Sequence, residues 1–262
     1  MPILIAEVGL MHYGCEAVLN AILERVPRRT GGCWLKLQCH TGQTVAPGPH
    51  PLYPSVDRAA WYAQTDLADA SLARIVACAR HYAIPIGWSC FSAEAVARVA
   101  RWQPDFWKIP SGEVTTLELR RAVRAAANGR PILVSNGLGG DLDIASDATG
   151  EIAMLCTSSY PCNPDHVGLS VPMPRGPWGI SDHTSDGIAG IAASVLGASY
   201  VERHICLARG MPGPDSSVAM PVSTVAKYMA TLDRAARCVV PEGRAEWLRS
   251  AEAAGMRKAF VP

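Results

Sequence analysis

The chain has 262 residues, of which 49% are hydrophobic, and a formal net charge of +1 at pH 7. This length allows one large α/β domain or two small ones, with enough apolar residues for a core. A nearly neutral chain without a basic block gives no sign of a nucleic-acid track or an anionic membrane surface, and its longest apolar runs are far too short to span a bilayer.

Short apolar runs alternate with amphipathic segments along most of the chain. Strands are predicted at residues 3–8, 33–38, 83–88, 105–109, 131–135, 151–156, 178–180 and 200–201. Helices are predicted at residues 16–25, 69–81, 93–102, 117–127, 186–196, 223–237 and 244–254, whereas residues 139–150 are too short and too poorly patterned for a full helix. A Pro-, Gly- and His-rich loop at residues 41–55 is long enough to cover an active site.

The N-terminus and the cysteines both indicate a protein of the cytoplasm. Met1-Pro2 leads directly into an apolar strand, without the basic region or cleavage site of an export signal. The nine cysteines are odd in number and contain no Cys-x-x-Cys pair, which argues against a zinc ribbon and against a disulfide framework. We interpret them as small buried hydrophobic residues in a reducing compartment.

Eight strands that alternate with helices or helix-sized gaps are typical of the α/β class, as a (β/α)₈ TIM barrel with some trimmed helices. We expect a single domain over residues 1–262, with the barrel at 3–236 and a C-terminal helix and truncated linker at 237–262. In this fold the chemistry lies on the loops that follow the strands. Polar residues gather there: Glu7, Lys36, Gln38, Lys108, Ser111, Glu113, Ser135, Ser158, Tyr160, Ser181, His183, Glu202 and His204.

His183 and His204 each end a predicted strand, and one helix separates the two strands. Parallel neighbours would bring the two imidazoles side by side. Each histidine follows or lies near a carboxylate, Asp182 or Glu202, that could orient it. Such a pair suits Mn²⁺, Co²⁺ or Zn²⁺, with Mg²⁺ possible if waters complete the shell. The alternative for either histidine alone is a hydrogen-bonded loop residue.

Two lysines, Lys36 and Lys108, lie inside apolar strands. A buried ammonium group is costly unless it meets an anion. Together with several hydroxyl groups around one barrel mouth, the two lysines suit a phosphorylated anion. Lysines that extend to solvent at strand ends are the alternative.

Eight motifs follow one another in a recognisable order. They are IAEVGxxHxG at 5–14, KLQ at 36–38, KIPSGE at 108–113, SNG at 135–137, CTSSYP at 156–161, GISDHT at 179–184, ERH at 202–204 and PGPD at 212–215. Over residues 3 to about 236 the chain resembles the sialic acid synthase family, which includes N-acetylneuraminate synthase and its legionaminic and pseudaminic relatives. The resemblance implies a TIM barrel and an enzyme, a transferase that forms a carbon–carbon bond. Such enzymes condense phosphoenolpyruvate (PEP) with an open-chain acetamido sugar aldehyde to give a nonulosonic acid and phosphate.

The resemblance also implies roles for individual residues. His183 and His204 match metal-binding histidines, and Mn²⁺ is the expected metal. Positions that hold PEP are matched by Lys36, Lys108, Ser111, Ser135, Ser158, Ser181 and Tyr160, and positions that face the sugar by Gln38, Glu113 and Asp215. Glu7 or Glu113 would carry protons, and the sequence does not choose between them. Helix caps, turns or plain packing are the alternative for the serines, Glu113, Tyr160 and Asp215.

The chain departs from the family pattern in several places. Met11 and Tyr13 stand where the family has two asparagines, Ser158 stands for an asparagine and Asn136 for a threonine. The family continues into a C-terminal antifreeze-like domain that covers the partner's barrel, and this sequence stops at the expected linker. We therefore expect a changed or smaller aldehyde, and either a homodimer or a separate capping protein.

Two other functions remain open at this stage. One is a related PEP or pyruvate aldol enzyme that uses a different aldehyde, such as a relative of 3-deoxy-octulosonate phosphate synthase. The other is a non-catalytic barrel that binds a metabolite.

Overall fold

A computed structural model of the chain describes residues 1–28, 32–41, 45, 47–51, 53–138, 150–169 and 176–239. Within these residues eight parallel strands form a sheet in the order β1-β2-β5-β6-β7-β8-β9-β10, and β1 also pairs with β10, which closes the barrel. The strands are β1 Ile3–Glu7, β2 Cys33–Cys39, β5 Ile86–Cys90, β6 Phe106–Ile109, β7 Ile132–Ser135, β8 Glu151–Cys156, β9 Trp178–Asp182 and β10 Tyr200–Cys206. The predicted TIM barrel is confirmed.

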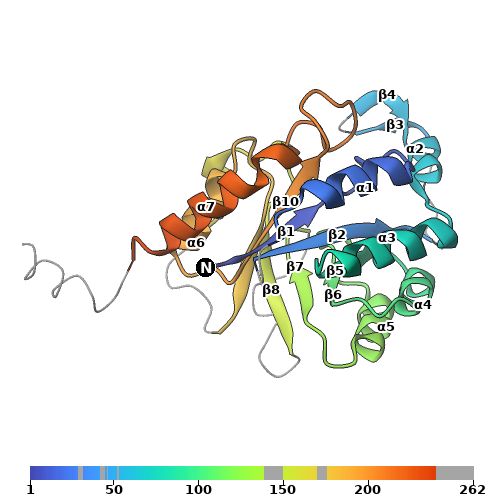
Figure 1. Ribbon diagram of the computed structural model, residues 1–262, viewed down its shortest axis with the longest axis horizontal. Helices are drawn as coiled ribbons and strands as arrows, with labels where there is room; N and C mark the ends of the chain where they lie inside the picture. The colour runs from blue at the N-terminus through green and yellow to red at the C-terminus, as the bar shows by residue number, and fades with distance from the viewer. Residues whose placement is uncertain are drawn as a thin grey trace, which may run out of the picture.

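Helices surround the barrel, with α1, α3, α4 and α5 on one side of the strands and α6 and α7 on the other (Figure 1). Their bounds are α1 Glu16–Arg25, α3 Asp69–His81, α4 Ala93–Ala100, α5 Leu117–Ala127, α6 Ile188–Val195 and α7 Val225–Ala236. Between β8 and β9 the described residues contain one 3₁₀ turn, Pro164–His166. Residues 170–175 of this connection lie outside the described residues, so its trimming stays a prediction. Residues 139–149 and the helix predicted at 244–254 lie outside the described residues.

The prediction of a loop at residues 41–55 is partly wrong. It contains an antiparallel hairpin of β3 Pro49–His50 and β4 Tyr53–Asp57, and the unpredicted helix α2 Arg58–Thr65 follows. The Asp57 side chain caps α2 by accepting a 2.9 Å hydrogen bond from the backbone N–H of Ala60. Hairpin and helix lie together at one end of the molecule (Figure 1).

Several strand boundaries also differ from the prediction. The strand expected from residue 83 begins at Ile86, because Ala83 has a left-handed φ of +54° and Pro85 has no N–H for a ladder. Two strands expected to end at residues 180 and 201 continue to Asp182 and Cys206. A short strand, β11 Met220–Pro221, pairs with the end of β10 and was not predicted.

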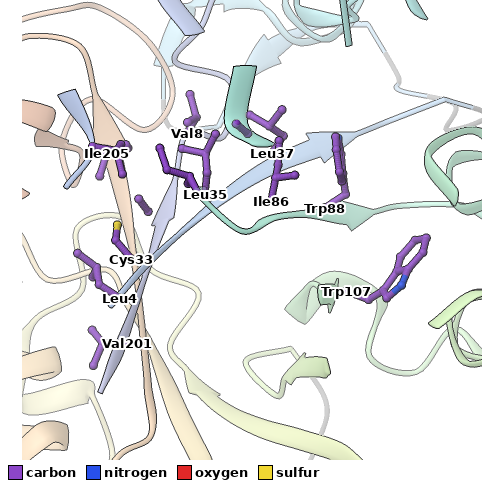
Figure 2. Close-up of a cluster of buried hydrophobic side chains, with 14 of the residues drawn as sticks. Leu4, Val8, Cys33, Leu35, Leu37, Ile86, Trp88, Trp107, Val201 and Ile205 are labelled. Carbon is purple, nitrogen blue, oxygen red and sulfur yellow. The ribbon is translucent and has the colours of Figure 1, made fainter. Parts of the chain in front are cut away.

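Alternation along each strand separates an outer core from the barrel interior. Leu4, Leu35, Ile86 and Val201 are fully or almost fully buried and belong to the core between strands and helices, and Figure 2 shows them with their neighbours from adjacent strands. Inside the barrel, a second apolar cluster contains Ile5, Phe106, Leu133 and Met154. Two residues further along these same inner faces the side chains become polar, at Glu7, Lys108, Ser135 and Cys156.

Candidate functional site

Lys36 lies in a buried polar layer inside the barrel. Its Nζ is 3.1 Å from Glu7 Oε2 and 3.3 Å from Glu202 Oε1, and it donates a 2.6 Å hydrogen bond to Ser89 Oγ. Strand β1 pairs with both β2 and β10, and places Glu7 beside Lys36 and His204. With 3% of its surface exposed, Lys36 does not extend to solvent.

Glu202 joins the two lysines. Its Oε2 lies 3.6 Å from Lys108 Nζ, while its Oε1 faces Lys36 and accepts a 2.8 Å hydrogen bond from Ser181. Lys108 Nζ in turn donates a 2.7 Å hydrogen bond to Ser135. The structure therefore brings both predicted lysines and two of the predicted serines into one layer, centred on a carboxylate.

The four charged groups of this layer have different proton affinities. Burial raises the pKa of Glu7 above its ordinary value. Burial also opposes ionisation of Glu202, but Lys108 and Lys36 outweigh it and hold the pKa of that carboxyl well below its usual range. Burial lowers the pKa of Lys108, with Glu202 offsetting only part, whereas for Lys36 the two carboxylates outweigh burial and raise its pKa. Burial thus works against the ionised form of Glu7, and the two lysines are the groups of this layer that can meet an anion.

The two histidines lie at the C-terminal ends of β9 and β10, as predicted, with ring centroids 5.6 Å apart. Tyr160 stacks on His183 at 4.1 Å and meets His204 edge-on at 5.9 Å. The Nδ1 of His183 lies 2.9 Å from the carbonyl oxygen of Thr157. A carbonyl oxygen only accepts, so Nδ1 donates to it, and the Cys156 thiol also forms a hydrogen bond with the His183 ring.

Asp215 reaches the same place from the loop that follows β10. Its Oδ2 is 3.6 Å from His204 Nδ1, and both side chains are buried. Burial lowers the pKa of His204 to about 4 and raises the pKa of Asp215. His204 is therefore a neutral imidazole at neutral pH, which is the form that binds metals.

Gln38 is held at both ends of its amide. Its Nε2 donates a 2.7 Å hydrogen bond to Glu7 Oε1, and its Oε1 lies 2.9 Å from His40 Nε2. The His40 ring stacks on Phe91 with centroids 4.1 Å apart. The amide of Gln38 is thus fixed next to Glu7, on the inner face predicted from its spacing to Lys36.

The remaining predicted residues lie nearer the rim. Ser111 Oγ and Ser158 Oγ are 2.8 Å apart, which places the loops after β6 and β8 in contact. Glu113 accepts a 2.7 Å hydrogen bond from the hydroxyl of Thr116, in the turn before α5. That contact agrees with the local role considered for Glu113, and its part in proton transfer stays a prediction.

The prediction that Asp182 and Glu202 orient the two histidines is wrong. Asp182 points out of the barrel, where it accepts a 2.8 Å hydrogen bond from the N–H of Gly190 and lies 3.4 Å from Arg203. The carbonyl of Thr157 contacts His183 instead, and Glu202 serves the lysines. Alternation explains the error for Asp182, because neighbours along a strand point to opposite faces. Glu202 shares the inner face with His204, but its oxygens lie against Lys36 and Lys108 on neighbouring strands.

Two interior residues were missed by the sequence analysis. Ser89 is the hydrogen-bond partner of Lys36, and alternation within residues 86–90 would have placed it inward once the strand was correctly bounded. Cys156, interpreted as a buried hydrophobic residue, lies 3.9 Å from Ser158. Burial raises the pKa of its thiol, but His183 and Lys108 outweigh that effect and lower it.

The two histidines fit a cation that takes most of its ligands from outside the protein. Among the residues that the structure describes, no three His, Cys, Asp or Glu side chains form a metal-binding group. However, His204 Nδ1 is buried and has no hydrogen-bond partner in that same part of the chain, and a buried unpaired nitrogen is costly unless a ligand satisfies it.

In the described residues, no helix is both long and apolar enough to cross a membrane.

Comparisons with known proteins agree on one family. A model described as the NeuB family matches residues 55–240. The pseudaminic acid synthase of Helicobacter pylori is 30% identical over 156 residues, 54% of this chain and 45% of that protein. Human N-acetylneuraminate-9-phosphate synthase is 28% identical over 141 residues, 48% of this chain and 38% of that protein. The matches thus span less than half the length of these relatives.

Solved structures share the fold. The crystal structure of an N-acetylneuraminic acid synthetase from Leptospira borgpetersenii serovar Hardjo-bovis, in complex with citrate, superposes with a TM-score of 0.78. The superposition covers 98% of this chain and 93% of that chain at 18% identity. At this identity the likeness concerns the barrel and not the chemistry.

Proposed function

The chain belongs to the NeuB family, and on that premise we propose that it condenses PEP with an open-chain acetamido sugar aldehyde, giving a nonulosonic-type 2-keto acid and inorganic phosphate. The observation that carries the proposal is the placement of Lys36, Lys108, His183 and His204 on the interior of one barrel, at the C-terminal ends of its strands. This is the end at which TIM-barrel enzymes carry their active sites.

PEP brings a phosphate and a carboxylate, and the buried lysines supply the positive charge that both need. Lys36 and Lys108 would exchange part of their contact with Glu202 for the anion, while Ser135 and Ser181 keep the ammonium groups and the carboxylate in place. Ser111, Ser158 and Tyr160 line the approach from the rim. Because this layer is buried and already ordered by hydrogen bonds, its charges would stabilise charge that develops during the reaction.

The proposed reaction joins C3 of PEP to the aldehyde carbon and releases phosphate from C2. PEP C3 forms a bond to the aldehyde carbon, whose oxygen takes a proton, and C2 becomes oxocarbenium-like. Water adds to C2 and loses one proton, which balances the proton taken up by the aldehyde oxygen. The bond from C2 to the phosphate oxygen then breaks as the new C2 hydroxyl passes its proton to the departing phosphate, and C2 becomes a ketone. We favour Glu7 over Glu113 as the proton carrier, since burial raises the pKa of Glu7 and Glu113 is engaged with Thr116.

His183 and His204 would hold a divalent cation, with Mn²⁺ the best match to two imidazoles and oxygen ligands. When bound, this ion supplies Lewis acidity for the aldehyde oxygen. Asp215 and Gln38 would face the sugar hydroxyls. Residues 3–236 would form the catalytic barrel and residues 237–262 a C-terminal helix and linker, with a second copy or a separate protein covering the mouth.

The test is mass spectrometry of products formed by the full chain from PEP, Mn²⁺ and a panel of aldehydes. The panel contains acetamido sugars, their phosphates and smaller aldehydes without an acetamido group. A condensed product with an acetamido sugar supports the proposal, and a product only with other aldehydes assigns a related aldol reaction. If calorimetry detects no binding of PEP or Mn²⁺, the barrel is not a catalyst of this kind.

A further inference from the structure

The loop that carries Asp215 rests on the turn that follows β1. The hydroxyl of Tyr13 donates a 2.6 Å hydrogen bond to the carbonyl oxygen of Pro212. Three residues later the carboxylate of Asp215 accepts a hydrogen bond from the backbone N–H of Leu10. Both ends of the short segment 212–215 are therefore attached to residues 10–13, although about 200 positions separate them in the chain.

The turn after β1 is a well-defined platform. Backbone hydrogen bonds run from Met11 N to Val8 O at 3.0 Å, from Tyr13 N to Leu10 O at 3.3 Å and from Cys15 N to His12 O at 2.8 Å. Tyr13 itself has a left-handed φ of +56°, which non-glycine residues adopt only where the surroundings hold them there. The backbone thus directs the Tyr13 side chain toward the other loop.

Apolar packing supports the same contact. Gly213 has a φ of +149°, and a Cβ at this position would lie only 3.0 Å from Met11 Sδ and 3.3 Å from the Trp61 ring. The Tyr13 ring meets Trp61 edge-on, with centroids 5.7 Å apart. Helix α2 and the β1 turn therefore enclose the segment 212–215 closely, and a side chain at Gly213 would be crowded by Met11 and Trp61 and strained by its positive φ.

This attachment fixes where a carboxylate meets an imidazole. Asp215 Oδ2 lies 3.6 Å from His204 Nδ1, and a Cβ on Gly9 would come within 2.7 Å of that same oxygen. A small shift of the segment 212–215 would move the carboxylate away from His204 or into the backbone of the β1 turn. The position of Asp215 therefore depends on the hydrogen bond that holds its loop at Pro212, three residues before it.

We propose that Tyr13 is a positioning residue, which holds the loop of Asp215 against the barrel mouth and so sets the geometry of the aldehyde side of the site. The inference rests on the proposed function for what Asp215 faces, but not for the contact itself. The Tyr13 side chain is long enough to reach the opposite loop, where its hydroxyl donates to the carbonyl oxygen of Pro212. The aldehyde would therefore enter a barrel mouth at which the loop after β10 is hydrogen-bonded to the turn after β1.

The first measurement compares Tyr13→Phe with the wild type and with Tyr82→Phe. Tyr82 lies at the end of α3, where Arg28 stacks on its ring at 3.8 Å, so its variant controls for the loss of a tyrosine hydroxyl. We expect the KM for the aldehyde to rise about threefold to tenfold in Tyr13→Phe, as for the loss of one hydrogen bond. The KM for PEP stays unchanged, and Tyr82→Phe matches the wild type in both. Equal changes in both KM values would overturn the positioning role.

The second measurement does not need turnover. Amide hydrogen exchange of residues 213–219 is expected to accelerate about threefold to tenfold in Tyr13→Phe and not in Tyr82→Phe, because a tie between two loops is lost. Unchanged exchange overturns the inference. If the wild type forms no product with any aldehyde, the proposed function fails, and exchange alone decides whether Tyr13 holds the loop.

Discussion

Glu202 is the residue on which the two buried lysines converge, with its oxygens 3.3 Å and 3.6 Å from Lys36 and Lys108. A carboxylate between two ammonium groups keeps both charged and in place without a substrate. When an anion arrives, the same lysines can turn toward it, since Ser89 and Ser135 already fix their direction. The buried layer is thus arranged before an anion binds.

Replacing Lys108 by methionine is expected to lower kcat/KM for PEP by about a hundredfold to a thousandfold, because an anion loses a buried charged partner. Lys227→Met, on the outer helix α7, is the matched control and leaves kcat/KM unchanged. Steady-state phosphate release measures both. A loss of less than tenfold in Lys108→Met would remove this lysine from the anion site.

Replacing His204 by alanine is expected to abolish saturable Mn²⁺ binding in calorimetry, together with metal-dependent turnover, since one of two imidazoles disappears. His81→Ala, at the end of α3, serves as the control. Full Mn²⁺ binding and activity in His204→Ala would exclude this histidine as a ligand.

His12 provides a test of pH dependence. Burial lowers its pKa from 6.5 to about 4, so between these values the unfolded chain holds a proton that the folded chain lacks. The free energy of unfolding therefore falls as pH decreases through this window, by about 2 kcal/mol at pH 5 for this residue. His12→Asn retains an acceptor for the N–H of Gly14. In urea titrations at pH 7 and pH 5, the free energy of unfolding of this variant should fall less between the two pH values than that of the wild type. An equal fall in the variant and the wild type would contradict the assignment of this pH dependence to His12.

At this scale the sequence predicted which residues gather inside the barrel better than what they contact. Period two placed Lys36 and Gln38 on one face, and the structure agrees. It could not show that Lys36 meets Ser89, or that Glu202 serves lysines and not His204, because such contacts depend on register across strands. Register is set by the whole closed sheet and leaves no local pattern.

A buried carboxylate, that of Asp182, stabilises the turn between β9 and α6. Asp182 Oδ1 accepts hydrogen bonds from Thr184 N at 2.8 Å and Thr184 Oγ1 at 2.6 Å, and its Oδ2 accepts one from Gly190 N at 2.8 Å. Arg203 of β10 lies 3.4 Å away and also donates to the carbonyl of Thr184. The turn that carries His183 is thus fastened from outside the barrel.

Asp182→Asn is expected to lower the free energy of unfolding by about 3 kcal/mol, since it leaves the guanidinium of Arg203 buried without its counter-ion. Asp186→Asn, a few residues along the same loop, is exposed and should lose less than about 1 kcal/mol. Chemical denaturation measures both variants. Equal losses would show that the buried pair contributes nothing special to this turn.

Helices with strong amphipathic patterns were predicted to the residue, as for α1, α3 and α5. The hairpin β3–β4 and helix α2 were not, because their short polar and aromatic segments lack a clear period. Asp57 directly before residues 58–65 is nevertheless an N-cap signal that was available in the sequence.

At the scale of the whole molecule, the closed sheet divides its side chains between an apolar shell and a polar centre. Closure through β1 and β10 brings Glu7 and His204, from the two ends of the barrel sequence, into register. The described barrel is complete by the end of α7 at Ala236. Its eight strands and their order were predictable from alternation alone.

A chain shortened to residues 1–239 is expected to keep a cooperative unfolding transition, with a free energy of unfolding within about 1 kcal/mol of the full chain, because the described barrel contacts lie within residues 3–236. Thermal and urea unfolding measure this. A lost or broadened transition would show that the barrel domain extends beyond residue 239.

The most direct test of the account is a crystal structure of the chain with PEP and Mn²⁺, recorded with anomalous scattering from manganese. We predict that the PEP phosphate or carboxylate lies within hydrogen-bond distance of Lys36 and Lys108, and that an anomalous peak lies between the imidazoles of His183 and His204. PEP bound elsewhere, or manganese away from both histidines, would contradict it.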